Sequence, residues 1–170
     1  MGFKRTSQLL NIGASVNESA ANTFTEEQLN LPLSTLDREV FIVTDLELTI
    51  SSPDAPAPGV ATAVFASLTK TSQTAIANIN QAECIGRIVK FSEQNAAGGT
   101  VVYADSHPTV RMSTGTKEDF LAVIATPNFF IQVSGQNNAG AEASQAKLTG
   151  YRAVADASLY AALVTEELNA

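Results

Sequence analysis

Histidine, cysteine and tryptophan are almost missing from this chain, and each shortage removes a class of protein chemistry. Among 170 residues there is one histidine, His107, one cysteine, Cys84, and no tryptophan. A structural zinc site uses about four cysteine or histidine ligands and a catalytic one usually three protein ligands, so we predict no metal site and no cofactor. The single cysteine excludes an intrachain disulfide. Without tryptophan, a glycosidase or lectin would lack its usual sugar-stacking surface.

The sequence contains no recognisable arrangement of residues for nucleophilic catalysis. Cys84 lies in the apolar run 84–89, where a free thiol usually behaves as a small buried hydrophobe, whereas reactive cysteines need an exposed, electropositive setting. No Gly-x-Ser-x-Gly motif occurs, and adjacent acids such as Glu118 and Asp119 are typical of solvated surfaces. We therefore predict no catalytic residue and no enzymatic activity. An enzyme on a β-sandwich that uses His107 and Cys84 stays open as an alternative.

Asp105 and His107 form the one local pair of metal-binding side chains. They lie two residues apart and would share a face of an extended segment. One aspartate and one histidine are too few for a zinc site of the usual kind, and Pro108 follows directly. This stretch therefore favours a surface turn.

Positive charge is also scarce. Ten lysines and arginines stand against seventeen aspartates and glutamates, which gives a formal net charge of −7. Binding to a phosphate backbone depends on clustered cations, and here the only adjacent pair near the N-terminus is Lys4-Arg5, so we predict no direct contact with nucleic acid.

No run approaches the roughly 20 apolar residues of a membrane-spanning helix, and residues 1–10 lack the apolar centre of a secretory signal. We expect a soluble protein made inside a cell.

The chain divides by composition into three parts. Residues 1–36 are rich in serine, asparagine, threonine and glutamate, and they predict an N-terminal arm, largely extended, with at most one short helix near residue 24. Residues 37–156 predict a β-sandwich, and residues 157–170 a short C-terminal helix. The arm has isolated apolar side chains that we predict to contact another subunit: Phe24, Leu29, Leu31 and Leu33.

The first few residues have a second interpretation. Phe3, Lys4 and Arg5 place an aromatic ring beside two cations, a combination that can rest on an anionic membrane surface. We favour a frayed terminus, or an arm that packs on a neighbouring subunit, over this membrane contact.

Residues 38–50 predict the first strand of the sandwich. Val40, Ile42 and Leu46 fall on one face at period two, whereas Glu39, Asp45 and Glu47 fall on the other, so the sequence predicts one buried face and one wet face. On this alternation, Phe41 and Val43 fall on the wet face, where a neighbouring subunit would cover them.

Further short runs predict strands near residues 60–70, 74–80, 84–91, 100–104, 109–113, 120–125, 129–134 and 146–155. The run 74–80 also suits a turn or a short helix. Residues 120–125 are continuously apolar, which predicts a central strand covered on both faces, and the turn at 126–128 predicts a hairpin with 129–134. About eight short strands without interleaved helices favour an all-β sandwich or barrel.

This layout resembles the single-jelly-roll capsid proteins of viruses. The features that carry the resemblance are the arm with its lone basic pair Lys4-Arg5, about eight strands, the proline-rich loop 51–59, the glycine and asparagine loops 94–99 and 135–140, and the shortage of catalytic side chains. The acidic balance is closest to the small major capsid proteins of tailless icosahedral DNA viruses with an internal membrane, where lipid separates shell from genome. The resemblance covers residues 31–155.

The resemblance implies an eight-stranded antiparallel jelly roll of two facing four-stranded sheets, and a structural subunit whose copies tile an icosahedral shell. The implied partners are other copies of the chain and, as an open alternative, a second capsid protein; the implied location is the virion, after synthesis in the host cytoplasm. A non-catalytic binding module, such as a spike, receptor-binding or decoration domain, is the other function that we consider.

Overall fold

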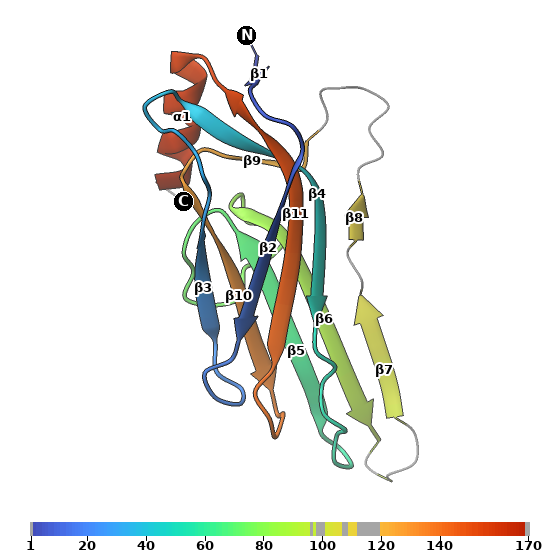
Figure 1. The fold of residues 1–170 in the computed structure, drawn as a ribbon. Coiled ribbons are helices and arrows are strands. Elements are labelled where there is room, and N and C mark those ends of the chain that lie inside the picture. The colour runs from blue at the N-terminus through green and yellow to red at the C-terminus, as the bar shows by residue number, and fades with distance from the viewer. Residues whose placement is uncertain (1, 96, 98–100, 107–108, 112–119, 169–170) are drawn as a thin grey trace.

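The computed structural model describes residues 2–95, 97, 101–106, 109–111 and 120–168, and for 101–106 and 109–111 it describes the backbone. Two antiparallel sheets face each other, and one helix lies at the end of the sandwich where both termini are found (Figure 1). The first sheet contains β1 (Lys4–Arg5), β2 (Leu10–Asn17), β4 (Glu39–Ile50), β8 (Thr109–Arg111), β9 (Ala122–Ile124) and β11 (Ala143–Val154). The second contains β3 (Thr25–Asn30), β5 (Ala61–Thr69), β6 (Cys84–Gln94), β7 (Val101–Ser106) and β10 (Asn128–Gln136). The helix is α1 (Ala157–Leu168).

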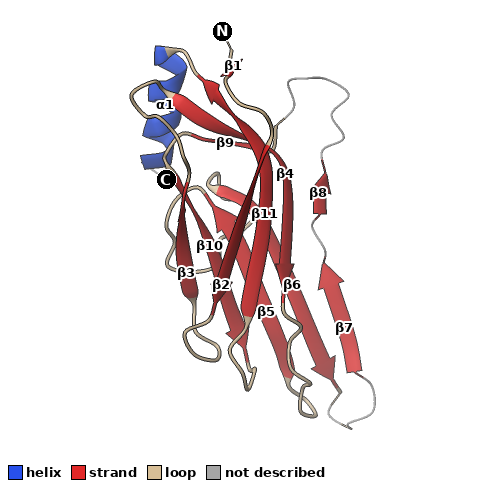
Figure 2. Ribbon diagram, viewed as in Figure 1, coloured by secondary structure: helices blue, strands red, loops and turns tan. Residues whose placement is uncertain are grey.

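The strand pairs are nested. β2 pairs with β11, β3 with β10, β4 with β8 and β9, and β5 with β6. Successive pairs fall alternately in the first and the second sheet, which is the pattern that results when one long antiparallel hairpin is rolled up on itself. This is the strand order of a jelly roll, and the predicted all-β sandwich is confirmed (Figure 2). The sheets are larger than the predicted four strands each. The first has six strands, because β1 is added and both β8 and β9 pair with β4, and the second has five, because β7 is added.

A β-bulge in β4 overturns the predicted single buried face. Asp45 pairs with Thr149 and Val43 with Gly150, so Thr44 is left without an opposite residue. Because side chains alternate with period two, one extra residue exchanges the two faces of the strand. Leu46, Leu48 and Ile50 therefore face the main core together with Phe41 and Val43, whereas Val40 and Ile42 face the other way. Phe41 and Val43, predicted to lie on the wet face, are fully buried.

The reverse face of the first sheet is covered by α1. Val40 and Ile42 pack there with Val123, Ala125, Ala153 and Ala155 beneath Leu159, Tyr160, Leu163 and Val164 of the helix.

The helix begins after Asp156, whose carboxylate accepts hydrogen bonds from the backbone N–H of Leu159 and the hydroxyl of Ser158; these two bonds lower the pKa of Asp156. Near its end, Glu167 accepts from the N–H groups of Ala125 and Thr126, both at 2.9 Å, which fixes the helix to the β9–β10 connection. The helix begins at Ala157, as predicted; residues 169–170 of the predicted segment lie outside the described residues.

Of the apolar run 120–125, residues 123–125 are buried on both sides as expected, with Ile124 in the main core and Val123 under the helix, whereas Phe120 is 42% exposed. The strand in this run is short and lies beyond β4 rather than at the centre of a sheet. The predicted hairpin is wrong, because β9 belongs to the first sheet and β10 to the second, so residues 125–127 cross between them. The predicted strand at 74–80 is also wrong: these residues form turns and irregular backbone.

The segment predicted as an arm contributes strands to both sheets. β2 pairs with β11 over eight residues, and β3 pairs with β10 over six. The prediction of a short helix near residue 24 is wrong, because Thr25 begins β3. The serine- and asparagine-rich composition that suggested an arm reflects edge strands, which expose one face and bury only every second residue.

Candidate functional site

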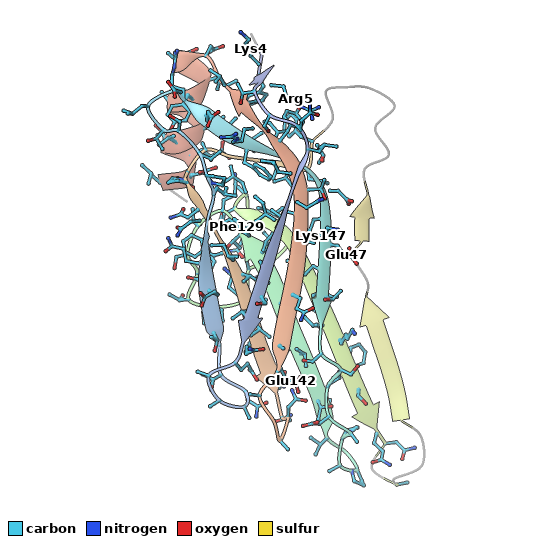
Figure 3. The ribbon with its side chains drawn as sticks, in the orientation of Figure 1. Lys4, Arg5, Glu47, Phe129, Glu142 and Lys147 are labelled. Atoms are coloured by element: carbon cyan, nitrogen blue, oxygen red, sulfur yellow. The ribbon has the colours of Figure 1, made fainter. Side chains whose placement is uncertain are left out.

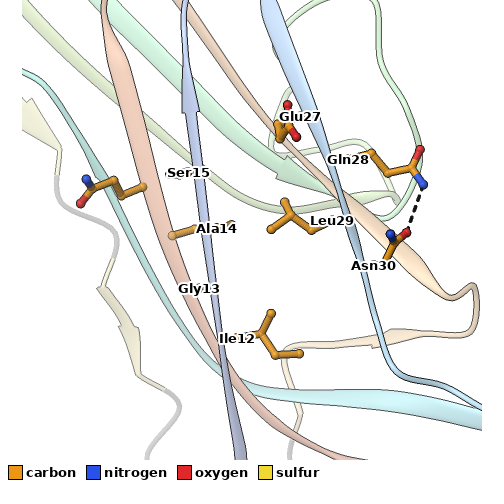
Figure 4. A pocket seen from close by; sticks show the side chains of 10 residues that line it. Ile12, Gly13, Ala14, Ser15, Glu27, Gln28, Leu29 and Asn30 are labelled. Atoms are coloured by element: carbon orange, nitrogen blue, oxygen red, sulfur yellow. Dashed lines mark hydrogen bonds between the residues drawn. The ribbon is translucent and has the colours of Figure 1, made fainter.

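One long side of the sandwich is open between β2 and β3, the edge strands of the two sheets on that side. A groove of about 620 Å³ runs between them (Figure 4). Its lining comes from residues 12–15 of β2, 27–30 of β3, and Gln145 and Ala146 of β11. It lies at the edge of the sandwich rather than at its centre.

Period-two alternation in each strand decides which side chains reach this groove. Ile12 and Leu29 are half-buried against the main core, and Ala14 is 8% exposed. Glu27 is exposed and lies two residues from Leu29, on the same face of β3. Glu27 is the only titratable residue that lines the groove, so acid–base catalysis with two groups has no second group here.

Of the four predicted subunit contacts, Leu29 lines the groove, and three belong to or pack against the core of their own chain. Leu31 is 4% exposed and belongs to the main core, while Leu29 and Leu33 pack against that core and Phe24 is half-buried. Leu31 therefore has almost no surface left for a neighbour. Contact of Phe24, Leu29 and Leu33 with a second subunit stays a prediction.

The predicted membrane-contact residues also have partners within the chain. The ring of Phe3 packs edge-on against Phe120, with centroids 6.1 Å apart, and the guanidinium of Arg5 lies 4.6 Å from the centroid of the Tyr151 ring. Lys4 pairs through its backbone with Val154 and its side chain is exposed (Figure 3). For Phe3 to enter a membrane it would have to leave Phe120, and this contact also stays a prediction.

At the opposite end of the sandwich, Glu18 joins two loops that the sequence did not connect. Glu18 is 5% exposed, and its carboxylate accepts hydrogen bonds from four backbone N–H groups, those of Asn22, Thr23, Gly135 and Glu142. Each carboxylate oxygen of Glu18 accepts two of these hydrogen bonds. The loop 18–24 and the β10–β11 loop are therefore held together by one carboxylate, and the spacing of residues far apart in the sequence gave no sign of it.

We expect Glu18→Gln to lower the free energy of unfolding by about 2 to 4 kcal/mol, because the amide NH₂ would face two N–H donors and leave them unpaired in a buried site. Urea denaturation followed by circular dichroism measures the change. Glu27→Gln is the matched control, since Glu27 is exposed and no hydrogen bond to its carboxylate is found within the described ranges. Equal midpoints for the two variants would show that the carboxylate does not hold the loops.

The loop 70–83 is held against the outer face of the second sheet by another polar network. Gln132 and Ser67 are fully buried; the hydroxyl of Ser67 donates to Gln132 at 2.8 Å and accepts from the N–H of Ala77 at 3.0 Å. The Gln132 amide donates to Thr69 and to Glu26. Because each group has its partner inside the chain, this network stabilises the loop and offers no vacant polar group to a ligand.

The residues considered for catalysis or metal binding are only partly described. Burial raises the pKa of the Cys84 thiol, and its Sγ contacts the carbonyl oxygen of Gly86 at 3.5 Å. A raised pKa leaves the thiol protonated at neutral pH, which is unfavourable for a nucleophile. His107 lies outside the described residues, so its pairing with Cys84 or Asp105 stays untested. Within the described ranges, no three histidine, cysteine or acidic residues cluster as metal ligands would, and no helix is long and apolar enough to span a bilayer.

Comparison with known proteins gives few matches. No protein-family model matches the sequence, and no curated protein matches it. A solved structure from desmodium yellow mottle tymovirus aligns over 89% of this chain and 91% of its own, with 12% identity and a TM-score of 0.28. One from turnip yellow mosaic virus aligns over 90% of this chain and 99% of its own, with 14% identity and a TM-score of 0.29. TM-scores this low do not establish a shared fold, and the jelly roll is recognised from the order of the strands.

Proposed function

We propose that this chain is a structural virion protein, a capsid subunit whose copies assemble into a closed icosahedral shell. The observation that carries the proposal is the jelly-roll strand order around an interior filled with apolar side chains. Phe41, Phe129 and Ile131 are all fully buried between the sheets, and the groove between β2 and β3 lies at the edge. A filled interior leaves the outer faces and the open edges as the surfaces through which the protein acts.

The jelly roll by itself is shared by viral capsid proteins, lectins and cupins, so the choice among them depends on the site. A cupin-type enzyme needs several metal ligands inside the barrel, and this chain has one histidine. A lectin favours aromatic sugar-stacking surfaces, and the edge groove is lined by no aromatic residue. A capsid subunit needs only a stable sandwich with faces and edges that other copies cover.

The net charge supports a finer version of the proposal. At −7 the chain is poorly suited to neutralise packaged nucleic acid, which fits a shell separated from its genome by lipid, as in tailless icosahedral DNA viruses with an internal membrane. On this proposal the protein is made in the host cytoplasm, ends in the virion capsid, is not an enzyme, and has other copies of itself as its main partner. A second capsid protein and contact of the N-terminus with the membrane are further parts of the proposal.

We expect purified protein to form dimers or larger assemblies as its concentration rises, and to form closed particles visible by negative-stain electron microscopy. Sedimentation velocity over a range of concentration measures the first expectation. Removal of residues 1–36 is not a useful test of assembly, because it deletes β2 and β3 and the buried Leu31. A folded protein that stays monomeric at all concentrations would contradict the proposal.

The alternative function is a non-catalytic binding module, and the groove between β2 and β3 is the feature that favours it. A binding module of this kind would be a compact monomer or trimer that forms no particles, so the same sedimentation experiment separates the two functions. Replacing His107 and Cys84 together would leave assembly unchanged under either one.

A further inference from the structure

β2 is an edge strand without the features that usually prevent edge strands from pairing. Its eight residues include no charged residue and no proline, and its pairing with β11 has no bulge. Alternate residues of an antiparallel edge strand direct their N–H and C=O groups away from the neighbouring strand, and in the described part of the chain β2 has no strand on its other side. Such an edge is a template for another strand.

β3, the neighbouring edge across the groove, differs in this respect. It carries Glu26 and Glu27 in succession, and Glu26 also binds the loop 70–83 through the backbone N–H of Gln73. Charges on an edge strand disfavour pairing with another chain. Of the two edges that border the groove, β2 is therefore the one open to a partner.

We propose that β2 pairs antiparallel with β2 of a second copy about a two-fold axis at Ala14, joining the first sheets of the two copies into one continuous sheet. This inference deepens the proposed function by naming one contact between subunits, and it depends on that function. An edge strand that pairs with itself is an isologous interface, the kind that closes into a dimer.

The sequence of β2 is complementary to itself in this register. Ala14 lies opposite Ala14 of the second copy, and Ile12 lies opposite Val16, so apolar residues that face the core meet residues of the same kind. On the other face, Gly13 lies opposite Ser15 and Asn11 opposite Asn17; these four residues are all exposed.

A shift of register by one residue is unfavourable, since it would bring buried positions opposite exposed ones. This self-complementarity argues for a second copy, rather than an unrelated peptide, as the occupant of the edge.

The groove gives the second copy a surface to cover. Ile12 and Leu29 are only half-buried in the single chain, and a strand beside β2 would remove more of their apolar surface from water. No charge lies on β2, so the contact itself needs no ion pair. Two copies of net charge −7 repel each other at long range, and salt screens that repulsion, so we expect the dimer to strengthen as ionic strength rises.

The experiment compares two glycine variants of the full chain by sedimentation velocity. A Cβ at Gly13, on β2, or at Gly140, in the β10–β11 loop, would have no heavy atom within 4 Å, so both positions accept a side chain without a clash. Gly13→Lys places two lysines close to the proposed axis, and we expect it to raise the dimer dissociation constant at least tenfold. Gly140→Lys changes the charge equally and is expected to leave the constant unchanged. Circular dichroism confirms that both variants are folded.

A crosslinking measurement tests the register. In a Cys84→Ser background, Ala14→Cys places two cysteines directly opposite each other at the axis, a separation that a disulfide can span. Asn17→Cys places them about six residues apart along the paired strands, and is the control. We expect an oxidised dimer from the first variant only.

The outcomes separate this contact from the proposed function. Assemblies that persist in Gly13→Lys without crosslinking at position 14 would overturn pairing through β2 and leave the capsid proposal standing. A wild-type protein that is monomeric at every concentration would overturn both. Loss of the dimer in Gly13→Lys together with crosslinking at position 14 would support the contact.

Discussion

Gly150→Ala is expected to prevent folding, or to lower the free energy of unfolding by at least about 3 kcal/mol. A Cβ built at Gly150 would lie 2.2 Å from the backbone oxygen of Ile42 and 2.8 Å from the ring of Phe41. Ile42 O is a main-chain atom in the middle of a sheet, and Phe41 is fully buried, so neither can move away without disturbing the core. Soluble yield and the urea midpoint measure the effect.

The matched control is Gly13→Ala, which introduces the same methyl group on an exposed strand position with no atom within 4 Å. We expect its stability to stay within about 0.5 kcal/mol of the wild type. The comparison isolates the close approach at the bulge, because both variants lose the same glycine backbone freedom in the unfolded chain. If Gly150→Ala were as stable as Gly13→Ala, the bulge at Thr44 would be wrongly placed.

Ile124→Asp is the second variant with a large expected effect. Ile124 is fully buried in the main core, where β9 pairs with β4, and an aspartate there would either keep its charge without a partner or become protonated at a cost. We expect a loss above about 4 kcal/mol, which is a large part of the 5 to 15 kcal/mol that stabilises a typical domain. The protein should therefore be insoluble or unfolded.

Ile79→Asp provides the comparison, since Ile79 is 68% exposed in the loop 70–83 and the change of side chain is identical. Soluble yield and near-ultraviolet circular dichroism should be normal for Ile79→Asp and lost for Ile124→Asp. Similar behaviour of the two variants would mean that residue 124 does not lie between the sheets.

Sequence reasoning was most reliable for segments whose character is local. The helix at residues 157–168 follows from a change of hydrophobic period, and the strand at 39–50 from a run of β-branched and apolar residues. The burial of residues 123–125 on both faces followed from a continuous apolar run. Each of these depends on neighbours within a few positions along the chain.

The errors came from features that depend on distant parts of the chain. The period-two pattern of β4 is continuous through Thr44, and only its pairing with β11 shows that one residue is bulged and the faces exchange. The turn at 126–128 resembled a hairpin, yet the two strands belong to different sheets. The polar residues 10–30 suggested an arm, because an edge strand has the same composition as a segment that lies on another surface.

The candidate site was predictable only in part. The sequence singled out Leu29, which lines the groove, whereas assembly rather than catalysis as the activity stays a proposal. It did not show that Ile12 and Leu29 border the same opening, since residues 12 and 29 are brought together by pairing with two different strands, β11 and β10. Glu18 was missed for the same reason: its four donors include Gly135 and Glu142, more than a hundred residues away.

The amino-acid sequence by itself determined which reactive side chains the protein has: it is acidic, with one histidine and one cysteine. It also determined the local structure, since the β-branched runs form strands and the last apolar stretch forms a helix. The tertiary structure alone decided which strands pair, which face of β4 is inside, and that β2 and β3 are the edge strands on one side of the sandwich. Side-chain periodicity is a local property and is visible in the sequence, whereas pairing and register depend on where distant segments meet in the fold.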